Sequence, residues 1–192
     1  MSRRSLILLA ILLMTVGACA RGQRGSGRES AHHEQQPMIE EAAPQAGDVV
    51  CVLVPTAGNS VAGTVRFHVA EGMTVITARV SGLQPGGKHA FHIHEFGDQT
   101  AADGASAGGH FNPHGHDHGG PDSKIRHAGD LGNLSADGAG EAFAELRVAD
   151  LPPADIVGRS VVIHAGQDDL VSQPAGNAGP RIAVGVIGWA KP

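Results

Sequence analysis

Apolar and polar side chains alternate in short runs along the chain from residue 48 onward. In the stretch SVAGTVRFHVA (60–70), Val65, Phe67 and Val69 alternate with polar or charged residues. A period of two places these apolar side chains on one face of an extended chain. Glycine, proline, asparagine and aspartate separate the runs, as turns require. The pattern predicts strands over 48–55, 60–70, 73–80 and 88–94, and an all-β domain.

Composition narrows the class of protein further. The chain has 192 residues, of which 28 are glycine, but no G-X-Y period, so it is not collagen-like. The length fits one domain with an N-terminal extension. The net charge of −5 argues against a nucleic-acid partner.

The N-terminus is typical of an export signal. A basic start at Arg3 and Arg4 precedes an apolar run, 6–14, that is too short to span a bilayer. Small residues then lead to Cys19, which resembles a bacterial lipobox, although a cleaved signal with an incidental cysteine is the alternative. We expect a lipoprotein-type signal peptide over 1–18, lipidation at Cys19 and a polar, flexible tether over 19–47. The protein would then reside in the periplasm or cell envelope, attached to the membrane only through its lipid.

The segment 92–130 contains seven of the twelve histidines and few large apolar residues. Such a segment has little hydrophobic surface to bury, so another interaction must order it. A dense cluster of histidine and aspartate indicates bound metal. His92 and His94 belong to a predicted strand, so their side chains project from the same face, opposite Phe91 and Ile93. That pair alone is weak evidence, since it also occurs by chance.

Several motifs make the metal interpretation specific. FHIHEFGD, SAGGHFNP, HGGP, RHAGDLGN, GRSVVIHAGQDDL and GNAGPRIAVGVIG resemble the copper/zinc superoxide dismutase family, in its order and near its spacing. The resemblance covers about residues 50–188. It implies an eight-stranded, flattened Greek-key β-barrel, akin to an immunoglobulin-like sandwich, with two long active-site loops, within a domain over 48–192. The later strands then fall at 127–134, 140–148, 158–164 and 181–189.

The resemblance also implies a role for individual residues. Copper would be held by His92, His94, His110 and His164, and zinc by His110, His118, His127 and Asp130. His110 would bridge the two ions, and Asp168 would join a copper-ligand histidine to a zinc-ligand histidine. Arg181 would attract the superoxide anion, and with His110 it would form the catalytic machinery.

The donor types agree with this assignment. Four imidazoles without a thiolate suit a tetragonal Cu(II) site, and three histidines with one aspartate suit closed, tetrahedral zinc. The implied function is a superoxide dismutase that disproportionates superoxide to oxygen and hydrogen peroxide at a copper centre beside structural zinc. The alternative is a non-catalytic copper/zinc-binding or copper-handling domain on the same fold.

The chain departs from the family at its usual disulfide. Where the family has its two paired cysteines, this chain has Gly104 and Val184. Cys51 matches a different cysteine of the family, which is free and buried in a strand. We therefore expect no disulfide, and we expect zinc to contribute more to loop order. A disulfide of this kind contributes about 2–4 kcal/mol.

Three further features concern the substrate, metal binding and assembly. The loop 165–180 has no lysine or arginine, so substrate steering would depend on Arg181 and the metals, with Lys124 and Arg126 as further candidates. His114 and His116 match no ligand and are expected to be solvated, although they could gather metal. Phe96, Gly97 and Trp189 fall where related proteins form a dimer contact, and we expect a homodimer there. The alternative for Trp189 is that it covers one end of the barrel.

Overall fold

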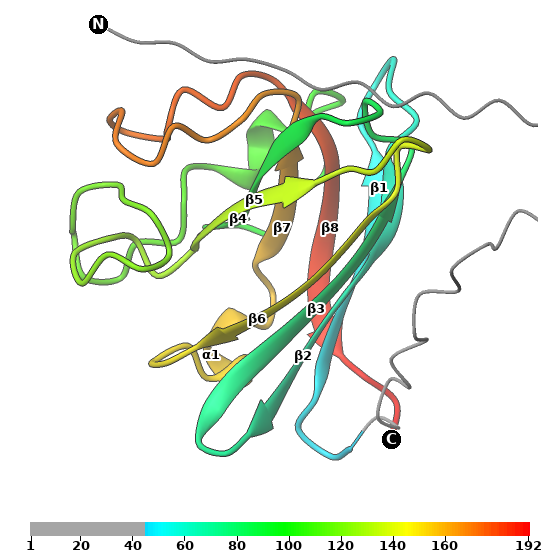
Figure 1. Cartoon of the computed structure of the whole chain (residues 1–192). Coiled ribbons are helices and arrows are strands. Elements are labelled where there is room, and N and C mark those ends of the chain that lie inside the picture. The colour runs from blue at the N-terminus through cyan, green and yellow to red at the C-terminus, as the bar shows by residue number, and fades with distance from the viewer. Residues whose placement is uncertain (1–44) are drawn as a thin grey trace, which may run out of the picture. The chain divides into compact units, whose positions relative to one another are not determined.

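The computed structural model describes residues 45–192, which form eight strands and two very short helices (Figure 1). The strands are β1 (Val49–Pro55), β2 (Ala62–Ala70), β3 (Met73–Ser81), β4 (Lys88–His94), β5 (Asp130–Ser135), β6 (Ala142–Val148), β7 (Ser160–His164) and β8 (Arg181–Trp189). The helices are the 3-10 turn η1 (Ala105–Ala107) and α1 (Pro153–Ile156). The predicted signal peptide, Cys19 and the tether up to residue 44 lie outside the described residues.

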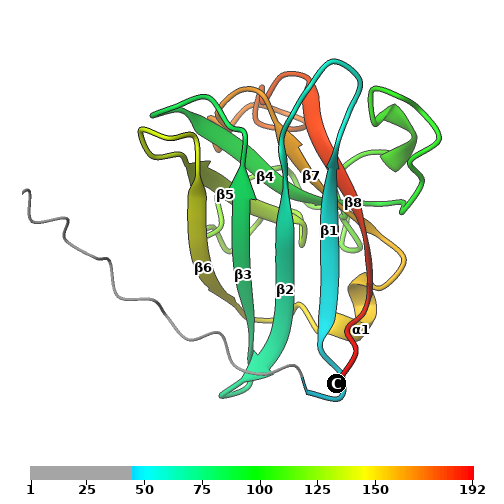
Figure 2. The same ribbon diagram turned by 90° about the vertical axis from the view of Figure 1, so that its right-hand side faces the viewer.

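All eight strands pair antiparallel in one sheet, in the order β5-β4-β7-β8-β1-β2-β3-β6. The sheet curves until its edge strands β5 and β6 approach each other, which gives a nearly closed Greek-key barrel (Figures 1 and 2). The prediction of an all-β barrel is confirmed. Within residues 45–192, no helix is long and apolar enough to cross a bilayer.

The barrel core follows the predicted alternation. Val65 and Phe67 of β2 are fully buried, whereas the neighbouring Thr64 is exposed. Val69 shares their face of the strand but is 62% exposed, near the end of β2, which turns into β3 directly after residue 70. The alternating face is therefore buried at Val65 and Phe67 but not at Val69.

Strand β4 is buried on both of its faces. Phe91 and Ile93 point into the barrel core, and His92 and His94 lie on the opposite face, yet all four are at most 1% exposed. Long loops must therefore cover the outer face of this part of the sheet. On the side of the barrel that these loops cover, the histidines of β4 can contact side chains from distant parts of the sequence.

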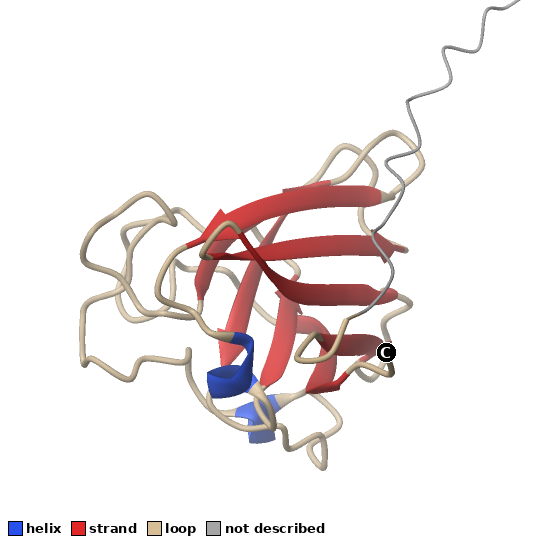
Figure 3. Cartoon of the chain, turned by 90° about the horizontal axis from the view of Figure 1, so that it is seen from below, coloured by secondary structure: helices blue, strands red, loops and turns tan. Residues whose placement is uncertain are grey.

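Two loops provide this cover: residues 95–129 between β4 and β5, and residues 165–180 between β7 and β8. Both lie on the same side of the barrel (Figure 1), and Figure 3 shows how much of that side is loop. Outside the barrel, Ala107 forms a small buried cluster with Val162 and Val184. The first loop is thus held partly by a small apolar contact, in addition to the other interactions that the sequence led us to expect.

Strand β5 begins at Asp130, three residues later than predicted. The residues before it form a turn in which the Asp130 amide donates to the His127 carbonyl at 3.2 Å. The Asp130 carboxylate in turn accepts the amides of His127 at 2.9 Å and Gly119 at 3.1 Å. The chain is therefore folded around this carboxylate rather than extended.

Candidate metal centre

The structure brings seven histidine and aspartate side chains into two adjoining groups. The first, called here the tetra-histidine group, contains His92, His94, His110 and His164. The second, the His₃Asp group, contains His110, His118, His127 and Asp130. In each group the potential ligand atoms lie within 4.8 Å of one another, and all the residues are buried. His110 belongs to both.

Backbone carbonyls fix the imidazoles of the tetra-histidine group. His94 donates from Nδ1 to the Gly108 carbonyl at 2.9 Å, and His164 donates from Nδ1 to the Gly179 carbonyl at 3.0 Å. In the neutral rings both Nε2 atoms then carry lone pairs, and these atoms face each other at 3.4 Å. Two facing lone pairs repel unless a cation lies close to both. The arrangement fits a bound metal ion.

The His₃Asp group is assembled around the Asp130 carboxylate. Its Oδ1 lies 2.7 Å from His110 Nδ1 and 3.2 Å from His127 Nδ1, and its Oδ2 lies 3.1 Å from His118 Nδ1. The two Nδ1 atoms of His110 and His127 are 3.4 Å apart. Four donor atoms that converge from three segments fit one small cation.

Most buried ring nitrogens without a hydrogen-bond partner lie in the same two groups. Among the described residues, three of the four such ring nitrogens lie in the two groups: His92 Nδ1, His110 Nε2 and His118 Nδ1. The fourth, His89 Nε2, lies outside them. A buried polar atom without a partner costs free energy unless something satisfies it. A metal ion in each group would accept these lone pairs, so the residues present fit two bound ions.

Asp168, at the base of the second loop, links the two groups. Its Oδ2 accepts from His92 Nε2 at 2.8 Å, and its Oδ1 accepts from His118 Nε2 at 3.0 Å. The Leu170 amide also donates to Oδ1, at 2.7 Å. Such contacts fix which ring nitrogen is free to bind metal. Here they leave Nδ1 free on both histidines.

Burial keeps three rings of the tetra-histidine group neutral. It lowers the pKa of His92 to about 4 and of His164 to about 3, and it lowers the pKa of His94 well below its ordinary value. Burial raises the pKa of Asp130, but hydrogen bonds from His110 and from the Gly119 amide outweigh it and leave the pKa below its ordinary value. Neutral imidazoles and an ionised carboxylate are the forms that bind metals.

Arg181 begins β8 and pairs in register with His164. Its guanidinium donates to the carbonyls of Gly104 and Gly108, the latter at 2.6 Å. The side chain is half-buried, and burial lowers its pKa from the ordinary value of 12.5. A cavity of about 450 Å³, lined by the second loop, reaches the adjacent His164. A fixed positive charge therefore lies beside the tetra-histidine group.

Two amide side chains that the sequence did not single out position these ligands. Gln173 Oε1 accepts the His118 amide at 2.8 Å, and its Nε2 donates to the His118 carbonyl at 2.9 Å. Asn133 makes the corresponding pair with the Asp168 backbone, at 2.8 and 2.9 Å. Asn133 falls inside the motif RHAGDLGN and could have been suspected. Gln173 falls between the recognised motifs and gave no signal.

The remaining residues of interest lie outside both groups. Gly104 and Val184 are neighbours, since a Cβ on Gly104 would come 2.7 Å from Val184 Cγ2. Cys51 is buried and free, and burial raises its pKa to about 12. Arg126 donates to the carbonyls of His127 and Ala128, so it orders the loop.

A nearly closed antiparallel barrel with two buried donor groups that share one imidazole defines a dinuclear metalloprotein. Residues 61–187 match the family model described as copper/zinc superoxide dismutase (SODC). The chain belongs to the copper/zinc superoxide dismutase family.

Individual relatives agree with this. The chain is 50% identical over 141 residues to a superoxide dismutase [Cu-Zn] of Paramecium bursaria Chlorella virus 1, covering 68% of this chain and 74% of that protein. It is 47% identical over 152 residues to one of Cordyceps militaris, covering 73% of this chain and 97% of the relative. It is 46% identical over 150 residues to one of Saccharomyces cerevisiae, covering 72% and 96%.

Proposed function

We propose that the tetra-histidine group holds copper, that the His₃Asp group holds zinc, and that the protein disproportionates superoxide to oxygen and hydrogen peroxide. The dismutase activity and both metals follow from family membership, together with two donor groups able to bind ions. The assignment of each residue is supported most directly by one observation. Of the four buried ring nitrogens without a hydrogen-bond partner among the described residues, three belong to the two groups.

The donor sets separate the two metals. Copper supplies the one-electron redox chemistry of the reaction, whereas zinc has no redox chemistry and acts structurally. Four imidazoles without a carboxylate suit copper, and three imidazoles with Asp130 suit zinc. His110 has a nitrogen in each group. Its Nδ1 lies 2.7 Å from Asp130 Oδ1, and its Nε2 has no hydrogen-bond partner among the described residues. It would therefore bridge the ions and hold or release a proton at Nε2.

Arg181 would bring the substrate to this centre. Its two hydrogen bonds to loop carbonyls hold the guanidinium in place without neutralising its charge. An anion entering beside His164 therefore meets a fixed positive charge. Because the loop 165–180 has no lysine or arginine, this attraction would come from Arg181 together with the metal ions.

The experiment measures copper and zinc content together with dismutase activity for the parent, His164→Ala, Arg181→Ala and Arg147→Ala. Arg147 is a matched control, because it is an exposed arginine paired with Glu71 on the barrel surface. We expect His164→Ala to lose copper and activity while it retains zinc. Arg181→Ala should retain both metals and lose most activity, and Arg147→Ala should resemble the parent. Full activity in Arg181→Ala, or unchanged copper in His164→Ala, would overturn the assignments.

We also propose that residues 1–18 form a signal peptide, that Cys19 is lipidated, and that residues 19–47 tether the domain 48–192 at the cell envelope. The basic start, short apolar run and small residues before Cys19 support this. Labelled fatty acid should enter the parent expressed in a bacterium, and Cys19→Ser should lose the label and leave the membrane fraction. Equal labelling of both would refute the anchor.

A homodimer through Phe96, Gly97 and Trp189 is the third proposal. Phe96 and Trp189 are each 57% exposed. Val186 is also exposed, and its Cγ1 would lie 3.0 Å from a Cβ placed on Gly97. Exposed apolar side chains of this size are typical of an interface. A second copy of the chain is expected to cover them. Light scattering should give a dimer for the parent and a monomer for Phe96→Glu, whereas a parental monomer would refute it.

A further inference from the structure

An exposed pair of histidines lies outside both buried donor groups. His114 and His116 flank Gly115 in the first loop, and both side chains are exposed. Gly115 has a φ of 64°, a conformation that favours glycine, and no atom lies near the place of a Cβ. The turn at Gly115 brings the two rings together, with centroids 5.5 Å apart and planes inclined by 37°.

This separation lies within the range of 4.0 to 6.4 Å between ring centroids of histidine pairs inside the buried groups. The ring centroids of His94 and His164 are also 5.5 Å apart, and those of His118 and His127 are 5.6 Å apart. Those pairs have ligand atoms close enough to share an ion. The exposed pair therefore has the spacing that this same protein uses where two imidazoles converge on a metal site.

His116 is oriented as a metal ligand usually is. Its Nδ1 lies 3.2 Å from the carbonyl oxygen of Arg126. A carbonyl can only accept, so Nδ1 carries the proton and the Nε2 lone pair stays available. Histidines that bind metals commonly donate their other ring nitrogen to a carbonyl in this way. Solvated surface histidines need no such partner.

The backbone of His116 is held as well. Asn112 Oδ1 accepts the His116 amide at 3.0 Å, and Asn112 Nδ2 donates to the His116 carbonyl at 2.8 Å. The side chain of Arg126, whose carbonyl holds the ring, is itself fixed to the carbonyls of the turn before β5. The imidazole is therefore attached to an ordered segment, and less conformational entropy is lost when it binds an ion.

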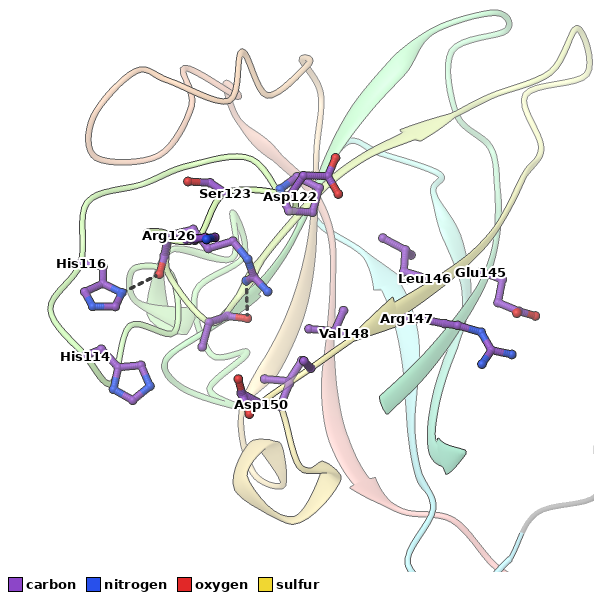
Figure 4. Close-up of a pocket in the computed structure, with 15 residues that line it drawn as sticks. His114, His116, Asp122, Ser123, Arg126, Glu145, Leu146, Arg147, Val148 and Asp150 are labelled. Carbon is purple, nitrogen blue, oxygen red and sulfur yellow. Dashed lines mark hydrogen bonds between the residues drawn. The ribbon is translucent and has the colours of Figure 1, made fainter. Parts of the chain in front are cut away.

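The pair borders an open cavity between this loop and β6. Its volume is about 730 Å³, and Figure 4 shows His114 and His116 together at the loop end of the cavity. Asp122 and Asp150 also line the cavity. Water fills such a space, so two imidazoles would leave the remaining coordination positions of an ion to solvent. Two nitrogen donors with oxygen ligands suit Cu²⁺ and Zn²⁺.

We propose that His114 and His116 form a third, solvent-exposed site for a divalent transition-metal ion of the Zn²⁺ or Cu²⁺ type, completed by water. The site is separate from the dismutase centre and does not require its activity. Because it has two protein ligands and faces solvent, it binds more weakly than the buried groups and exchanges its ion readily.

The test uses the full-length protein already loaded with copper and zinc, dialysed against buffered free Zn²⁺, with bound zinc measured by mass spectrometry. The variants are His114→Gln, His116→Gln, the double variant and His68→Gln. His68 is a matched control, since it is a partly exposed histidine on β2 with no place in either group. Histidines outside residues 45–192 are present in every sample and cancel in the comparison.

We expect the parent and His68→Gln to bind one equivalent of zinc more than the double variant. Because both rings hold the ion, each single variant should lose the whole equivalent, as the double variant does. The two buried metals should remain in all variants, which shows that they are folded. Equal zinc in the parent and the double variant would overturn the proposal. Losses in the single variants that merely add up would also overturn it, because they indicate two independent imidazoles.

Discussion

The substitution Asp168→Asn tests how one carboxylate supports both metal groups. In the parent, Oδ2 accepts from His92 Nε2 at 2.8 Å and Oδ1 from His118 Nε2 at 3.0 Å. Hydrogen bonds from His92 and the Leu170 amide, which outweigh the effect of burial, hold the pKa of Asp168 below its ordinary value, so the group is charged. The asparagine side chain has the same shape but no charge and only one oxygen.

The magnitude follows from that geometry. The amide oxygen can serve one ring, and the amide NH₂ then faces the N–H of the other, so one charge-assisted hydrogen bond is lost. Such a bond contributes about 1.5–3 kcal/mol, which is roughly a 10- to 150-fold change in an equilibrium constant. Loss of a partner that orients a metal-binding histidine costs about 10–100-fold in metal affinity.

The two histidines differ in what else holds them. His92 belongs to β4, which the sheet fixes on both sides, whereas His118 lies in the loop 95–129. His118 therefore loses its position more easily, although Gln173 still clamps its backbone. We expect zinc affinity to fall by about 10–100-fold and copper affinity to fall less.

The assay is competition for each metal against a chelator of known affinity. Asp169→Asn is the matched control: it removes the neighbouring carboxylate, which is exposed and accepts only from residues of its own loop, at Val171 and Ser172. Parental zinc affinity in Asp168→Asn would refute the reasoning. An equal loss in Asp169→Asn would show that net charge, not the bridge, is responsible.

Three further outcomes follow from the structure. Because burial lowers the pKa of His92 and His164 from the ordinary 6.5 to about 4 and about 3, the unfolded chain binds more protons in this range. Urea unfolding of the metal-free protein should show full stability above about pH 6.5 and a progressive loss toward pH 4, whereas a rise on acidification would contradict this. Removing both metals should speed amide hydrogen exchange across 97–126 more than across the strands of the barrel, and unchanged protection would defeat the idea that zinc orders this loop. Gly176→Ala should reduce zinc retention, because its Cβ would clash with the Asp168 carboxylate. Gly86→Ala, at a glycine of similar positive φ with open space around it, should retain zinc, and equal zinc in both variants would count against the clash.

The sequence alone predicted the barrel and its histidines because both depend on local periodicity and short motifs. Val65 and Phe67 alternate with polar residues, and this predicts a strand with one buried face whatever packs against it. His92 and His94 must project together from an extended chain for the same reason. The motifs around His110 and His164 then indicated the family, and with it the metals.

Tertiary structure decided what depends on contacts between distant segments. Asp168 reaches His92 and His118 only because the second loop folds over β4, and Gln173 holds His118 across 55 residues of sequence. The turn that starts β5 late exists because amides wrap the Asp130 carboxylate, which no period in the sequence encodes. Residue pattern fixes which side chains share a face of a strand, but loop closure, burial and hydrogen bonding fix which nitrogen of each histidine remains free.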